Sequence, residues 1–239
     1  LKDIRVDFRK DVKDLRSDVR VRIGTTTMEE LKEAIEARRE KFKENVETVR
    51  TEAKKRIEDN SAELAENLKV IKDQKKQDIV KRADVKIQDI NTRQLEHFEN
   101  ILKKIEDVLA KVETRIEKAL ARGLDVSTAQ ANVVETETAI ATAREAILTQ
   151  QSNVYTITVT DEATLKDNAS TTVKALHDDL VSVRNLVKAA HEALRVTAVS
   201  LAQIPHVNDD TATTTATTTA TTTATNTEDT TTATTTTSN

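Results

Sequence analysis

The chain has no cysteine, one proline, two glycines and few aromatic side chains, which make up only 2% of its residues. Without cysteine it can form no disulfide, no thiol nucleophile and no thiolate-bound metal. So few aromatic side chains leave little with which to stack on nucleic-acid bases. We therefore expect no nucleic-acid partner, and we expect long helices in place of a large compact core.

The chain also lacks a long apolar run, because no stretch approaches the roughly 20 residues needed to cross a bilayer. Its net charge of −4 is unevenly distributed: residues 1–122 hold 31 Lys and Arg against 27 Asp and Glu, and residues 123–239 hold 6 against 14. In the first half the two signs interleave, as they do on a solvated helical face. The composition therefore predicts an all-α protein.

Apolar residues recur every eleven positions over much of the chain. An eleven-residue repeat is close to three helical turns, and no Pro or Gly lies between Met28 and Arg122, so the pattern predicts one helix of about 140 Å. The repeat consists of Ile35, Val46, Ile57, Leu68, Ile79, Ile90, Ile101 and Val112.

The region 1–86 is predicted to form a coiled-coil arm. Residues 1–23 have a helical apolar stripe and Gly24 interrupts it, so this segment should pair with the long helix as an N-terminal helical hairpin. The segment 72–77 is the weakest point of the long helix, where a bend would fold the arm back into a closed bundle. Otherwise another helix should cover the narrow seam formed by Ile35, Val46, Ile57, Leu68 and Ile79.

The region 87–204 is predicted to form a slender three-helix bundle, because its apolar stripe widens. The expected helices are 87–122, 127–151 and 165–203, with Gly123 as a C-terminal cap. Residues 154–160 alternate between apolar side chains and Thr, which is the period of a strand. They could recruit a strand from another chain, but an extended connector that caps the open end of the bundle is the preferred interpretation.

The region 205–239 is predicted to be a disordered Thr/Ala-rich tail. In residues 211–239, 19 residues are Thr and Ala is the largest apolar side chain. Such a composition resembles O-glycosylated stalks, although an unmodified linker is the alternative. Asn168-Ala169-Ser170 matches the pattern of an N-glycosylation site, which makes Asn168 a candidate acceptor in a secreted protein.

Residues for catalysis or metal binding are hard to find. The four histidines are His97, His177, His191 and His206, and even His177 and His191 would lie about 20 Å apart along one helix. No Gly-rich phosphate loop and no nucleophile with a neighbouring base is evident. We therefore expect no enzyme, no cofactor, no metal and no small-molecule substrate. Membrane-surface contact is a minor alternative, mainly for residues 1–23.

Three stretches together carry a resemblance: Arg93-Gln-Leu-Glu-His-Phe-Glu-Asn-Ile-Leu102, Lys118-Ala-Leu-Ala-Arg-Gly-Leu-Asp-Val-Ser127 and Val199-Ser-Leu-Ala-Gln-Ile-Pro205. They resemble uncharacterised, predicted-secreted coiled-coil proteins of ultra-small symbiotic bacteria, which combine a leader, a long charged helix, a helical region and a Thr/Ser-rich tail. The resemblance implies a secreted or cell-surface location, and it implies no activity. The leader itself is not in this chain.

Two functions remain open at this point. The first is a non-enzymatic extracellular or cell-surface coiled-coil protein that acts as a spacer or scaffold and assembles through its seam as a homo-oligomer or with a partner helix. The alternative is an extracellular or periplasmic helical adaptor that binds a protein or lipid partner.

Overall fold

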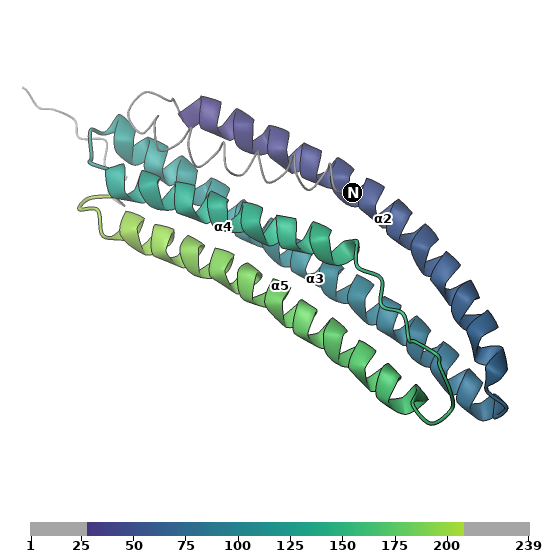
Figure 1. Ribbon diagram of the computed structural model, residues 1–239. Helices are drawn as coiled ribbons and strands as arrows, with labels where there is room; N and C mark the ends of the chain where they lie inside the picture. The colour runs from purple at the N-terminus through teal and green to yellow at the C-terminus, as the bar shows by residue number, and fades with distance from the viewer. Residues whose placement is uncertain (1–27, 208–239) are drawn as a thin grey trace, which may run out of the picture. The chain divides into compact units, whose positions relative to one another are not determined.

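The structure, a computed structural model, describes residues 28–207, which belong to the first of two compact units of the chain. Figure 1 shows the arrangement of the helices. The predicted first helix of the hairpin, residues 1–23, and the Thr-rich tail at 211–239 lie outside the described residues.

The described residues form four long helices and a short 3-10 helix, with no strand among residues 28–207. Because the helices alternate in direction and are joined by short links or one extended connector, the fold is an all-α bundle. The elements are α2 (Met28–Asn67), η1 (Leu68–Val70), α3 (Gln74–Ala121), α4 (Ser127–Gln151) and α5 (Leu165–Ala202).

The helix from Met28 to Arg122 is not unbroken, because the chain reverses between α2 and α3. The bend that the sequence allowed at 72–77 lies a few residues earlier, between Asn67 and Gln74. Leu68 and Ile71 are buried in the turn, and Ile71 has an extended backbone. The Asp73 carboxylate then caps α3 by accepting hydrogen bonds from the backbone of Lys75 and Lys76. An apolar residue every eleven positions cannot reveal this turn, since the repeat continues from Leu68 to Ile79 across it.

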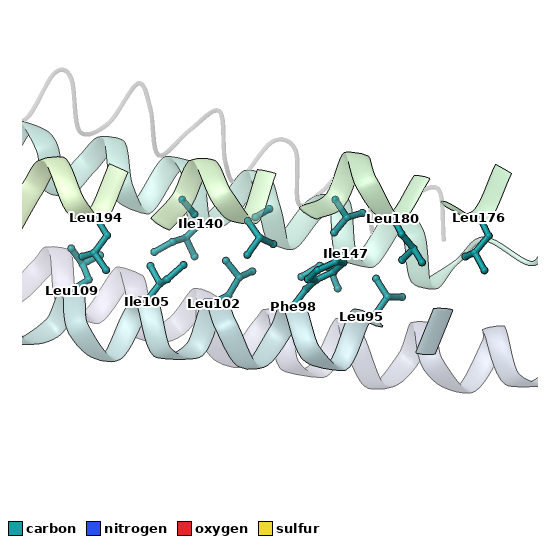
Figure 2. Close-up of a cluster of buried hydrophobic side chains, with 14 of the residues drawn as sticks. Leu95, Phe98, Leu102, Ile105, Leu109, Ile140, Ile147, Leu176, Leu180 and Leu194 are labelled. Carbon is teal, nitrogen blue, oxygen red and sulfur yellow. The ribbon is translucent and has the colours of Figure 1, made fainter. Parts of the chain in front are cut away.

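The predicted three-helix bundle is confirmed, and α3, α4 and α5 enclose the main core. The interface between α4 and α5 is the most extensive in the molecule. Figure 2 shows that the core side chains of α3 point toward those of the other two helices. This packing buries the wide apolar stripe that the sequence places on α3. The labelled core residues are Leu95, Phe98, Leu102, Ile105 and Leu109 of α3, Ile140 and Ile147 of α4, and Leu176, Leu180 and Leu194 of α5.

Helix α2 lies beside α3 and α4, on the side of that pair opposite α5 (Figure 1). Its own apolar cluster joins Phe42, Val46 and Val49 to Leu148 of α4. The predicted boundary between an arm and a bundle, after residue 86, falls inside the uninterrupted helix α3. Within the described residues the part of the arm that forms α2 is therefore packed along the bundle.

Gly123 ends α3 as the sequence predicted. Its φ angle is +78°, a backbone conformation that side chains other than glycine rarely adopt. The Gly123 amide donates to the Leu120 carbonyl, and the Leu124 amide donates to that of Ala119. These bonds satisfy carbonyls at the helix end, so the next helix can begin at Ser127 after a short link.

The segment 154–160 forms no strand and follows the preferred interpretation of an extended connector. It runs beside the bundle and reaches the start of α5, so it does not sit as a cap over an open end (Figure 1). Helix α4 has 25 residues and α3 has 48, and the connector continues the path of α4 over the remaining length. The period of two remains visible, because Tyr155 and Ile157 are buried whereas Thr156 and Thr158 are exposed.

Candidate functional site

The predicted partner seam is covered mainly by the protein itself. Val46 and Leu68 are buried, and Ile57 is half-buried. Ile79 lies beyond the turn, on α3, and 58% of it is exposed. The side chain of Ile35 lies outside the described part of the structure. The four described members of the seam therefore do not lie on one exposed surface.

Asn168, the candidate glycosylation residue, lies in the first turns of α5 and is half-buried. Its side-chain nitrogen, the atom that would carry the glycan, donates a hydrogen bond of 3.0 Å to the Thr158 carbonyl. The side chain thus fastens the connector to α5. Glycosylation there remains a prediction.

Charged side chains are buried where α2, α3 and α4 meet. Arg144 of α4 forms an ion pair with Glu106 of α3, and their side chains are 12% and 7% exposed. Arg39 of α2 also approaches Glu106, with its Nε 3.6 Å from Glu106 Oε2. The Arg144 guanidinium lies over the Phe42 ring, 4.7 Å from its centre. The cluster links three helices, because each supplies one of the charges.

Glu137 lies in the same cluster and is buried, with no hydrogen-bond partner for its Oε1. Its burial, together with the nearby carboxylates of Glu113 and Glu106, raises its pKa to about 7 against the opposing effect of Arg39 and Arg144. Burial likewise raises the pKa of Glu106, and Arg144 opposes that increase. Burial is therefore the main cause of the raised pKa of both carboxyls.

A second polar network surrounds Tyr155 where the connector meets the bundle. The Tyr155 hydroxyl donates to the Asp179 carboxylate of α5 at 2.6 Å and accepts from Gln150 Nε2, also at 2.6 Å. Gln150 Nε2 also donates to Asn91 Oδ1, and Gln88 donates to the Tyr155 carbonyl. Burial and the bond to Asp179 raise the pKa of Tyr155 to about 12, so the hydroxyl stays protonated at neutral pH.

Replacing Tyr155 with Phe should lower the free energy of unfolding by about 1–2 kcal/mol, because a carboxylate loses its donor while the ring still fills its site. Urea unfolding at pH 7 measures the change. The exposed neighbour Thr158 provides a control, and Thr158→Ala should change stability by less than about 0.5 kcal/mol. Equal effects of the two variants would show that the hydroxyl network does not hold the connector.

An open groove runs between α3 and α5 and has a volume of about 630 Å3. Apolar residues form part of its lining, and polar or charged residues from both helices form the rest. The lining comprises Gln94, His97, Phe98 and Ile101 of α3 with Arg184, Val187, Lys188, His191 and Glu192 of α5. A solvent-accessible groove of this kind can receive a side chain or a helix.

No group of three or more potential metal ligands occurs within the described residues. Among the helices of residues 28–207, none combines the length and the hydropathy needed to cross a membrane. Comparison of the chain with protein-family models, curated proteins and solved structures found no match. The site must therefore be interpreted from its own geometry.

Sequence reasoning missed both the buried charged cluster and the groove. A signal for the first was present, because Arg144 is the only cation in the Ala- and Thr-rich helix α4 and stands among its apolar positions. A signal for the second was the spacing of Lys and Arg along α3. Neither signal identifies its neighbours, since those come from helices far apart in sequence.

Proposed function

We propose that this protein is a non-enzymatic helical binding module whose docking surface is the face shared by α3 and α5. One observation carries the proposal: a row of aliphatic side chains on one side of α3 is exposed along this face, and it includes Ile79 and Ile90 of the eleven-residue repeat, whose last member, Val112, is buried. Ile79, Ile90 and Val108 are 58%, 49% and 44% exposed, and Ile101 lines the groove beside them. Aligned aliphatic side chains left in water on a helix surface are typical of an interaction site.

The same geometry argues against the spacer or scaffold that the sequence favoured. That function relied on an uncovered seam along α2, and α2 instead packs Val46 and Val49 against Leu148 of its own chain. Self-association through those residues would require α2 to separate from α4. Assembly through the α3–α5 face remains the second candidate, because the exposed aliphatic row could meet a second copy.

The experiment that separates the two candidates is light scattering on the intact chain over a wide range of concentration. A binding module that awaits a different partner should keep the monomer mass of 26.6 kDa. The variant Ile90→Asp should have the same mass, since no interface between copies is lost. Val85→Asp is the matched control, because Val85 is 65% exposed on another side of α3.

A mass that is a multiple of 26.6 kDa and falls to that of the monomer in Ile90→Asp, but not in Val85→Asp, would contradict the binding module. It would support self-assembly in its place. Circular dichroism of both variants checks that the bundle stays folded, as expected for substitutions at exposed positions.

The proposal includes no catalytic role and no cofactor. A secreted or cell-surface location also belongs to the proposal, and the resemblance in sequence supports it. An extracellular or periplasmic module without disulfides would rely on its helical packing alone for stability.

A further inference from the structure

We infer that the partner of the α3–α5 face is an amphipathic helix whose apolar stripe is flanked by acidic side chains. The inference rests on the proposed function and specifies the chemistry of the partner. It depends on the distribution of charge around α3 and α5, which is independent of the exposed aliphatic row.

The exposed aliphatic row, formed by Ile79, Ile90 and Val108 of α3, has the width and length of the apolar stripe of a helix. On a helix with 100° between residues, Ile79, Ile90 and Val108 lie within about 20° of one another. They extend over 30 residues, or about 45 Å of helix. A helix laid along the α3–α5 groove would cover this row with its own apolar stripe.

Cations border the row on the α3 side. Most Lys and Arg residues of α3 fall within a sector of about 60°, next to the aliphatic row, and none of its Asp or Glu residues falls in that sector. The side chains of this sector are exposed. We name five of them the α3 basic row: Arg82, Lys86, Arg93, Lys104 and Lys111.

Cations also border the groove on the α5 side. Arg184 and Lys188 line it, and Arg195 follows about two turns after Lys188. Exposed acids partly offset these charges: Arg93 pairs with Asp89, Arg195 pairs with Glu192, and Asp78, Glu96 and Asp107 lie within one turn of the α3 basic row. Such exposed pairs are weak, so both borders of the groove remain positive.

The packing of α2 shows how charge selects a helix on the other side of α3. There the acids of α3 meet cations of α2: Arg50 Nη2 lies 2.9 Å from Glu99 Oε2, and Arg39 approaches Glu106. Two arginines of α2 thus face acids of α3, although α2 as a whole carries more Asp and Glu than Lys and Arg. By the same complementarity, an acidic helix fits its basic side.

The chain's own N-terminal segment lacks this complementarity. Residues 1–23 carry eight Lys or Arg residues against five Asp residues. Placing this segment between two positive borders would bring like charges together. A separate, acidic helix is therefore the better occupant.

The test uses the full chain and two labelled synthetic peptides of 21 residues with the same Leu-based helical stripe. One peptide has Glu at all flanking positions and the other has Lys. In fluorescence anisotropy the Glu peptide should bind at least tenfold more tightly than the Lys peptide, and added salt should weaken it. The double variant Lys104→Glu with Lys188→Glu should weaken Glu-peptide binding at least tenfold, whereas Lys54→Glu with Lys55→Glu on α2 should change it less than twofold.

Equal binding of both peptides would overturn the charge inference while leaving a docking face in place. No binding of the Glu peptide at 100 μM to a monomeric chain would overturn the acidic helix as the occupant. The protein is also tested for flotation with vesicles that contain phosphatidylserine. Flotation that the double variant Lys104→Glu with Lys188→Glu abolishes would make an anionic membrane, and not an acidic helix, the occupant of the face. The light-scattering experiment on the intact chain and on Ile90→Asp tests the docking function separately from the charge of the partner.

Discussion

Replacing Arg144 with Met should lower the free energy of unfolding at pH 8 by about 3–5 kcal/mol, the typical cost of removing one partner from a buried ion pair. Met retains much of the length and packing of Arg. The loss is electrostatic, because Glu106 is only 7% exposed and would keep Arg39 as its remaining cation, 3.6 Å away. Urea unfolding followed by circular dichroism measures the difference.

The effect of Arg144→Met should decrease as the pH falls. Removing the cation raises the pKa of Glu106 above its already raised value, and the protonated carboxyl no longer needs a partner. A group with a raised pKa in the folded state loses stability as the pH increases through that pKa, so the largest loss lies at high pH. At pH 5 the variant should be closer to the parent protein.

Two companion variants test this explanation. Arg195 pairs with Glu192 at the surface, so Arg195→Met should destabilise the protein far less than Arg144→Met. Adding Glu106→Gln to Arg144→Met should recover part of the lost stability, since the buried charge that Arg144 neutralised is then absent. If the double variant is as unstable as Arg144→Met alone, packing and not charge explains the loss.

Replacing Glu137 with Gln should raise the free energy of unfolding at pH 8 by up to about 3 kcal/mol and leave it nearly unchanged at pH 5. The pKa of Glu137 rises from an ordinary 4.5 to about 7 in the folded protein. Its protonated form therefore contributes stability that is complete below pH 4.5 and is lost as the pH rises through 7. Gln has nearly the same shape and carries no charge, so it avoids that loss.

The measurement is urea unfolding of the parent and the Glu137→Gln variant at half-unit steps between pH 5 and pH 8. Glu135 is exposed, two residues before Glu137 on the other side of α4, and Glu135→Gln provides the control, because it removes a carboxylate outside the buried cluster. Parallel pH profiles for Glu137→Gln and the parent would show that Glu137 is ionised in the folded bundle without penalty.

The bundle of α3, α4 and α5 could be predicted because its signals are local. The apolar stripe recurs at helical spacing, Gly123 provides the left-handed residue that ends α3, and the alternation around Tyr155 and Ile157 marks which side of an extended chain is buried. Each signal comes from residues a few positions apart, whose backbone conformation decides which of them share a face.

The position of α2 could not be predicted in the same way. An eleven-residue spacing describes a face of a helix, and it is unchanged when the chain turns at Leu68 and resumes at Gln74 with a compatible phase. The turn is favoured because it buries Leu68 and Ile71 and brings Phe42 and Val46 against α4. That gain exists only once α3 and α4 are in place.

The sequence alone determined that the chain is helical, which face of each helix is apolar, and that most cations of α3 lie in a sector without acids. Only the tertiary structure decided that α2 covers the acidic side of α3, that Arg144 meets Glu106, and that the basic side borders an open groove with α5. The physical reason is that periodicity is a property of one helix, whereas burial and ion pairing depend on which helices become neighbours.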